Sequence, residues 1–412
     1  MSTTASPDNI SPRVSLRYLF FTFLKIGAVS FGGHMGLVAV VKNVMADKDK
    51  TLQHSTILDA VGIGSLLPGP LAVNVVAYVG YAMRKTAGSI VSTIGVILPA
   101  CIAMLLLSWA YFKYGYQQQF KEIMYYVTGA VSAIILSTGL QLYVKELRGD
   151  NVKTIICLAG FVGILLTNNY VLTIGFIIAG GILGSTLKLQ TGKSSVNAGS
   201  ENSRILYRRP GIVSLVILAG LLCLVLLFVT NAQQYTTNIL LKIIILFSGI
   251  SLTLFGGGYV MIPIMQTLFV TDMGWLTQQE FLDAIALSQS TPGPILVSAT
   301  FIGYKMKGFA GAIVATIAIF APSAILKVMV AKAYLQVKDY PLAKNILSGV
   351  KAVVIGLIIG SAIKIGAQLT WNIPLALITV GAFVGSFRFK ISPVYLILSS
   401  ALCGFIIWFV SK

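Results

Sequence analysis

The chain carries one helix-breaking pattern twice, at a constant distance. Phe31-Gly32-Gly33 is followed by Pro68-Gly69-Pro70, and Phe255-Gly256-Gly257 is followed by Pro292-Gly293-Pro294. We call these the first and second FGG and PGP motifs. Both pairs are 224 residues apart, since 255 − 31 and 292 − 68 give the same value. Such a repeat inside apolar sequence predicts a transporter built from two internal repeats, with its substrate site at the breaks.

Composition points to a membrane environment. Hydrophobic residues make up 56% of the 412 residues and charged residues 10%, and the mean hydropathy is +0.88. Soluble globular proteins carry about 25% charged residues, whereas a membrane-spanning helix needs about 20 apolar residues. We therefore predict an all-α polytopic membrane protein. The polar start of the chain has no cleavage-signal pattern, so we expect it to be a cytoplasmic tail.

The net charge of +18 does not indicate a nucleic-acid partner. The basic residues cluster in short loops, as the positive-inside rule produces in any inner-membrane protein, and no soluble basic domain is present. The cysteines stand alone and show neither disulfide nor metal spacing; they are Cys101, Cys157, Cys223 and Cys403. We expect no cofactor and no metal.

Thirteen apolar segments divide the chain into two repeats. The first six lie near 15–45, 56–83, 87–112, 122–144, 152–168 and 169–188, a seventh near 211–230, and six more near 238–270, 281–304, 309–335, 343–368, 372–387 and 391–410. The predicted units are a repeat over 13–189, a polar linker with a linking span over 190–237, and a repeat over 238–412. Seven membrane crossings separate the starts of the two repeats. Because this number is odd, the second repeat is inverted relative to the first. Loop charges then favour a bacterial inner-membrane protein with a cytoplasmic N-terminus and an outside C-terminus.

Each PGP motif predicts a broken helix with an anion site at the break. Proline removes a backbone donor, and the residue before it avoids helical angles. Pro70 and Pro294 would each begin a new half-helix, whose free amides and positive dipole end suit an anion. The FGG glycines would let a ligand approach the backbone; the alternative is that they only allow close helix packing.

Polar and charged side chains near the breaks complete the predicted site. Asn74 and Ser298 are equivalent positions one turn after the PGP motifs, and Lys25 and His34 flank the first FGG motif. Each of these side chains has the alternative of a purely structural role. The candidate substrate-binding residues are Lys25, Phe31, Gly32, Gly33, His34, Pro68, Gly69, Pro70, Asn74, Phe255, Gly256, Gly257, Gly258, Gln289, Ser290, Thr291, Pro292, Gly293, Pro294 and Ser298.

Two further sets of ionisable residues follow the repeat. Asp59 and Asp283 share the 224-residue offset and are candidates for proton coupling, with a helix-end role as the alternative. Basic residues follow both PGP helices and predict an electropositive funnel that concentrates anions; the alternative is snorkelling at helix ends. These funnel candidates are Arg84, Lys85, Lys305 and Lys307.

The doubled pattern resembles the chromate ion transporter family in its long-chain, two-repeat form. The matching residues are both FGG and PGP motifs with Gly258, Trp275-Leu276, Glu280-Phe281 and Gln289. The resemblance covers nearly the whole chain and implies an inner-membrane carrier that exports chromate. The first half departs from the pattern, since His34 stands where the family often has proline and Ser65 stands opposite Gln289.

The leading hypothesis is therefore secondary-active export of chromate, or of a sulfate-like anion, by alternating access. One alternative, of another class, is a flippase for a lipid-linked phosphate. A second is a transporter whose natural substrate is sulfate or another tetrahedral oxyanion. An enzyme is disfavoured, because no span holds a nucleophile–base pair or a carboxylate pair. The expected partners are a small oxyanion and the lipid bilayer, and the sequence leaves a homodimer open.

Overall fold

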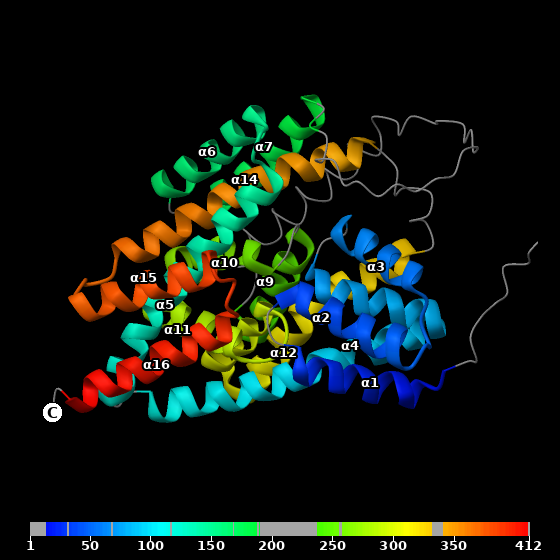
Figure 1. Cartoon of the computed structure of the whole chain (residues 1–412), viewed down its shortest axis with the longest axis horizontal. Helices are drawn as coiled ribbons and strands as arrows, with labels where there is room; N and C mark the ends of the chain where they lie inside the picture. Colours follow the sequence, from blue (N-terminus) through cyan, green and yellow to red (C-terminus); the bar gives the residue numbers. More distant parts are fainter. Residues whose placement is uncertain are drawn as a thin grey trace, which may run out of the picture.

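The protein is an all-α polytopic membrane protein. Its computed structural model describes residues 14–30, 33–66, 69–115, 118–167, 169–187, 189, 237–254, 258–331 and 341–410. Within these ranges every regular element is a helix (Figure 1). Five helical stretches are long and apolar enough to cross a bilayer: Leu71–Tyr114, Gln119–Glu146, Ile295–Leu326, Lys344–Ala367 and Pro393–Val410. The expected linking span near 211–230 lies outside the described residues.

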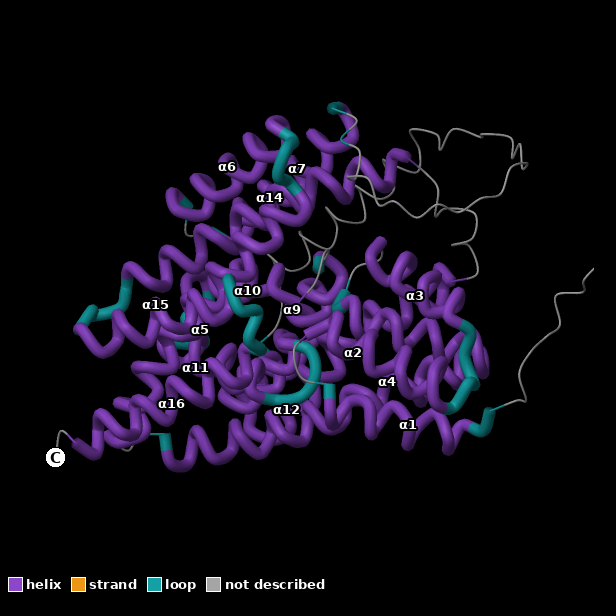
Figure 2. Tube along the Cα trace, in the orientation of Figure 1, coloured by secondary structure: helices purple, strands orange, loops and turns teal. Residues whose placement is uncertain are grey.

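The helices fall into two series of the same order. The first series is α1 (Leu16–Val29), α2 (Gly33–Val41), the π-helix η1 (Lys42–Lys48), α3 (His54–Leu66), α4 (Leu71–Tyr114), α5 (Gln118–Glu146), α6 (Asn151–Leu166) and α7 (Tyr170–Thr186). The second is α9 (Ile239–Thr253), the 3₁₀ turn η2 (Gly258–Val260), α10 (Met261–Met265), the π-helix η3 (Gln266–Asp272), α11 (Gln278–Ser290), the 3₁₀ turn η4 (Ile295–Val297), α12 (Ser298–Ala331), α14 (Pro341–Ala367), α15 (Ile373–Phe387) and α16 (Pro393–Val410). Short loops connect most of these helices (Figure 2).

Each FGG motif lies between two helices that run antiparallel. At the start of α1, Tyr18 donates a hydrogen bond to the carboxylate of Asp49, which follows η1. In the second series Phe247 of α9 stacks on Phe269 of η3, with ring centroids 5.0 Å apart. We call these two units the first and second FGG hairpins. Segments 15–45 and 238–270, each expected as one continuous span, instead fold back on themselves as two antiparallel arms.

Each PGP motif also lies between antiparallel arms. The Asn74 side chain donates to the Gly64 carbonyl across the first motif at 3.1 Å, and Lys305 pairs with Glu280 across the second at 2.5 Å. We call these units the first and second PGP hairpins. The arm α3 has 13 residues and is about 20 Å long, which is shorter than the roughly 30 Å of a bilayer core. The predicted breaks are confirmed, but segments 56–83 and 281–304 fold back instead of continuing across.

A sharp turn follows each PGP hairpin and starts a long helix. In α4 the helix breaks at Arg84 and Lys85, and in α12 it breaks at Lys307 and Gly308. Across the second turn the hydroxyls of Thr300 and Thr316 lie 2.8 Å apart, so the chain reverses there. The boundaries predicted between residues 83 and 87 and between 304 and 309 are confirmed.

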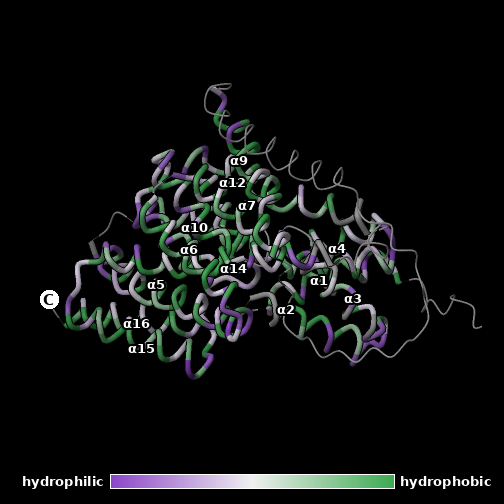
Figure 3. The backbone as a smooth tube through the Cα atoms, turned by 90° about the horizontal axis from the view of Figure 1, so that it is seen from above, coloured by the Kyte–Doolittle hydropathy of each residue, from purple (hydrophilic) through white to green (hydrophobic). Residues whose placement is uncertain are grey.

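The two series are intertwined. The long helix α14 packs against α6 and α7 (Figure 1), and its equivalent α5 packs against α15 and α16. Glycines bring these backbones together: a Cβ on Gly184 would lie 2.3 Å from the Asn345 carbonyl oxygen, and one on Gly356 would lie 2.0 Å from that of Cys157. Hydrophilic residues gather mainly at helix ends and connections (Figure 3), as expected for a chain embedded in lipid.

Candidate functional site

The PGP tip of each series contacts the other series at the residue that precedes the FGG motif. The amide of Gly69 donates to the Leu254 carbonyl at 2.6 Å, and the amide of Gly293 donates to the Ser30 carbonyl at 3.1 Å. Both donors and both acceptors are 224 residues apart in the sequence. This reciprocity brings the breaks of both series together around an approximate twofold axis.

The glycine of each PGP motif is required by its backbone. Gly69 has φ +105° and Gly293 has φ +122°, a region that glycine alone adopts readily. Gly293 is also held by its neighbours, because a Cβ there would lie 2.8 Å from the Cβ of Ala100 on α4. Each tip is therefore a tight turn of fixed backbone shape that is hydrogen-bonded to the other series.

The amide donors at these tips differ from those expected. The Gly69 and Gly293 amides are already engaged, and Pro70 and Pro294 have no N–H group. The first helical amides after each motif have no carbonyl one turn earlier within their helix. They belong to Leu71 and Ala72 in the first hairpin and to Ile295 and Leu296 in the second. The half-helix donors thus begin one residue later than the sequence indicated.

Two side chains of the second PGP hairpin place buried polar atoms near its tip. Gln289 is 6% exposed and Ser298 is fully buried. Neither amide atom of Gln289 nor the Ser298 hydroxyl has a hydrogen-bond partner among the described residues. Burying unpaired polar atoms is unfavourable, so such groups point to a bound ligand or water. They can donate to an oxyanion without adding charge.

The other predicted polar side chains donate hydrogen bonds to backbone carbonyls of their own hairpin. Asn74 donates to the Gly64 and Gly69 carbonyls and holds the first PGP turn. Ser290 donates to the Ala286 carbonyl, and Thr291 donates to that of Ser288. Among the side chains that the structure describes, unpaired donors near a PGP tip therefore come from the second hairpin; the side chain of Ser65, which is equivalent to Gln289, is not described.

The remaining predicted binding residues are described only in part. Lys25 is exposed on α1, so its side chain is not among the buried polar groups near the tips. Gly258 does lie near the second PGP tip, where a Cβ would contact the Leu296 side chain at 3.5 Å. The structure does not describe Phe31, Gly32, Pro68, Phe255, Gly256 and Gly257. The side chain of His34 is likewise not described, and Gly33 is the first residue of α2.

The basic residues after the PGP hairpins divide into two kinds. Arg84, Lys85 and Lys307 lie at the sharp turns, with Lys85 and Lys307 exposed. Lys305 instead forms the ion pair with Glu280, which satisfies its charge locally. The electropositive funnel stays a prediction, and within it Lys305 is already engaged in an ion pair.

The two candidate aspartates have different surroundings. Asp59 is exposed on α3. Asp283 is 2% exposed and accepts hydrogen bonds from Tyr111 of α4 at 2.6 Å and from Gln279 at 2.8 Å. Gln279 also donates to Thr128 of α5 at 2.7 Å. A buried polar network thus joins three helices at one aspartate.

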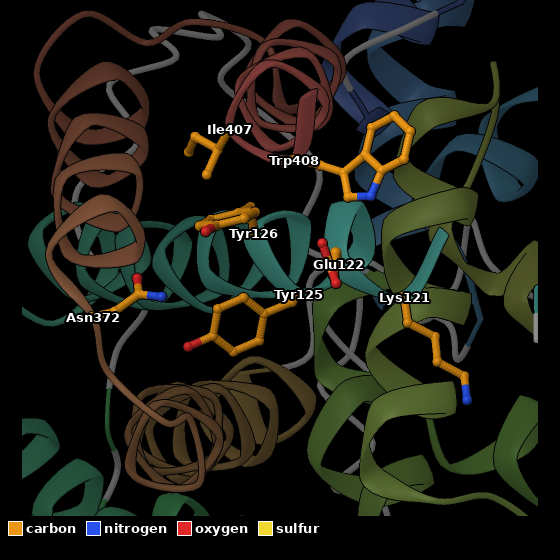
Figure 4. A pocket seen from close by; sticks show the side chains of 7 residues that line it. All are labelled: Lys121, Glu122, Tyr125, Tyr126, Asn372, Ile407 and Trp408. Atoms are coloured by element: carbon orange, nitrogen blue, oxygen red, sulfur yellow. The ribbon is translucent and has the colours of Figure 1, made fainter. Parts of the chain in front are cut away.

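A groove of about 440 Å³ lies away from the hairpin tips, between α5, α15 and α16 (Figure 4). In Figure 4 Tyr126 and Ile407 face each other, whereas Lys121 points away. The groove is lined by Lys121, Glu122, Tyr125, Tyr126, Asn372, Ile407 and Trp408. Its one basic side chain, Lys121, points outward, and Glu122 adds a negative charge to the lining.

The sequence matches the model of the chromate transporter family over residues 17–185 and again over residues 241–405. The chain belongs to the chromate transporter family. The starts of the two matches are 224 residues apart, the same spacing as the motifs. No solved structure matches the chain.

Three relatives of this chain are each less than 30% identical to it. A probable chromate transport protein of Synechococcus elongatus is 28% identical over 99% of this chain and 100% of its own length. The chromate transport protein of Cupriavidus metallidurans is 26% identical over 98% of this chain and 96% of its own. An uncharacterized transporter of Bacillus subtilis matches 36% of this chain with 86% of its length, at 28% identity.

Sequence reasoning missed the residues that receive the tips and those that surround Asp283. Ser30 and Leu254 carry the 224-residue offset, so the repeat itself was a usable signal for them. Tyr111 and Thr128 come from other helices, and no local pattern marks them. Their role appears only when the chain is folded.

Proposed function

We propose that this member of the chromate transporter family exports chromate across the bacterial inner membrane by alternating access. The observation that carries the proposal is the reciprocal contact of Gly69 with Leu254 and of Gly293 with Ser30. It joins four helix breaks from two repeats at one place, as in secondary transporters whose substrate binds between repeats. The choice of chromate as the substrate is supported by two relatives that are named as chromate transport proteins.

In this proposal the oxyanion binds at the PGP tips. Its oxygens would accept hydrogen bonds from the first amides of the second arms, where the helix dipole favours negative charge. Gln289 and Ser298 would add side-chain donors from the second repeat. Among the described side chains, the binding site then draws more donors from the second repeat than from the first.

The proposed topology is inverted, with repeats over 13–189 and 238–412. Replacing two spans by re-entrant hairpins removes two crossings from each repeat, so the odd number of crossings between equivalent points is unchanged. The N-terminus would be cytoplasmic and the C-terminus outside. An inside-negative potential then favours outward movement of a dianion by about 4.6 kcal/mol per 100 mV.

The direct test is uptake of chromate by proteoliposomes that contain the purified protein. We expect saturable chromate uptake that sulfate inhibits. Equal preference for sulfate would identify the natural substrate as a sulfate-like anion. No uptake in either orientation of the protein would refute the proposal.

A sharper test changes the second PGP tip. The variant Pro292→Ala/Gly293→Ala loses the turn that begins the half-helix, and we expect at least tenfold slower transport. Gly175→Ala is the matched control, because a Cβ there has no neighbour within 4 Å. Normal transport by a well-folded double variant would remove the half-helix from the mechanism.

A further inference from the structure

Asp283 is a buried carboxylate surrounded by neutral hydrogen-bond donors. Its two oxygens accept from the Tyr111 hydroxyl and the Gln279 amide. Gln279 connects this aspartate to Thr128 of α5. Among the described residues, no lysine or arginine forms an ion pair with Asp283.

The charged groups around Asp283 do not neutralise it. Glu280 is the charged group that acts on it, through repulsion, and Glu280 is itself paired with Lys305 of α12. From α4 the titratable group is Tyr111, and Asp272 of η3 accepts the Tyr170 amide instead.

An ionised carboxylate in these surroundings is expensive, whereas the protonated form is neutral. A protonated Asp283 can donate to the Tyr111 hydroxyl, which is able to accept as well as donate. The equivalent Asp59 is exposed, so of these two aspartates Asp283 is the buried one. The network can therefore hold the aspartate in either protonation state.

We infer that Asp283 takes up a proton when the oxyanion binds at the hairpin tips, and that one proton crosses the membrane with each anion. This inference rests on the proposed function. Asp283 precedes Ser290 by seven residues of α11, or about 10 Å along the helix. A dianion at the tip repels an ionised Asp283 and favours its protonation. By linkage, protonation strengthens anion binding by the same factor.

The sign of this coupling has a consequence for transport. The proton enters from the side where the anion binds and leaves on the side where the anion is released. Each cycle then moves a net charge of −1 instead of −2. The membrane potential still drives export, but with half the force that acts on the bare dianion.

The first experiment measures chromate binding to the purified protein from pH 7 to pH 9. For the wild type we expect affinity to fall roughly tenfold or more as pH rises, from charge repulsion over about 10 Å. Asp283→Asn mimics the protonated side chain, so its affinity should stay high and lose this difference. Asp59→Asn is the matched control and should behave as the wild type. Both proteins meet the same chromate species, so protonation of the ligand cancels in the comparison.

The second experiment measures the reversal potential of chromate flux in proteoliposomes. We expect one net negative charge per anion for the wild type and two for Asp283→Asn. A variant that keeps the wild-type pH dependence and the wild-type charge would overturn the inference and leave the proposed function standing. A wild type that neither binds nor moves chromate would overturn both.

Discussion

The sharp turns in α4 and α12 have the same backbone shape but different residues. Lys85 has φ 52° and ψ −145°, and its counterpart Gly308 has φ 56° and ψ −145°. This region is close to glycine-only, and a residue with a Cβ held there costs about 1–3 kcal/mol. The first turn is therefore strained where the second is relaxed, and Lys85→Gly should relieve the strain.

The expected gain is a balance of three effects. Relief of strain contributes about 1–3 kcal/mol, while the greater freedom of glycine in the unfolded chain removes about 0.5–1 kcal/mol. The Lys85 ammonium also lies 5.9 Å from the Tyr81 ring, a contact worth about 0.5 kcal/mol at an exposed site. The net prediction for Lys85→Gly is a stabilisation of about 1 kcal/mol. The reverse change, Gly308→Ala, should destabilise by about 1–2 kcal/mol, and its Cβ meets nothing within 4 Å.

Thermal unfolding of the detergent-solubilised protein measures both effects. We expect the midpoint to rise for Lys85→Gly and to fall for Gly308→Ala. Lys85→Ala is the control, because it removes the charge and keeps the strain, so its midpoint should stay near that of the wild type. If Lys85→Gly unfolds at a lower temperature than Lys85→Ala, the strain argument is refuted.

Two further predictions concern stability. A Cβ at Gly80 would lie 2.4 Å from the Gly88 carbonyl oxygen, so Gly80→Ala should destabilise by at least about 2 kcal/mol, while Gly175→Ala should leave the thermal midpoint unchanged. Asp150 caps α6 and pairs with Lys153 at 3.2 Å. Burial raises the pKa of the Asp150 carboxyl. The hydrogen bonds and the charge of Lys153 outweigh this effect, so the pKa of Asp150 is lowered overall. The pair therefore stabilises the protein above the unfolded pKa of Asp150. This contribution, under about 1 kcal/mol because solvent screens the partly exposed Asp150 carboxylate, is lost as pH falls through the lowered pKa. Asp150→Asn should show a smaller loss of thermal stability over that acid range, and an identical loss would contradict the assignment.

The sequence predicted where the helices break but not where the chain goes afterwards. An apolar stretch of 28 residues, such as 56–83, fits one broken span or two short arms equally well by length. The choice depends on contacts across the break, such as Asn74 with Gly64 and Lys305 with Glu280. These residues are 10 and 25 positions apart, beyond the reach of helical periodicity.

The site was predicted in part for a related reason. A constant offset identifies equivalent residues, and it correctly paired the two PGP tips. It cannot show which amides are already engaged, because the acceptors at Ser30 and Leu254 belong to the opposite repeat. It also cannot show on which side of α1 Lys25 lies, since that depends on packing against α4. Long-range packing, which local sequence does not encode, decides both.

The central claim is that an oxyanion binds where the two PGP tips meet. Its most direct test is the chromate dissociation constant of purified Gln289→Leu, which keeps the volume of the buried side chain and removes its amide. A hydrogen bond to a charged ligand contributes about 1.5–3 kcal/mol, so the constant should rise by roughly ten- to a hundredfold. Ser290→Ala is the neighbouring control, because the Ser290 hydroxyl already donates to the Ala286 carbonyl, and its constant should not change. Unchanged chromate affinity in a folded Gln289→Leu protein would contradict the account.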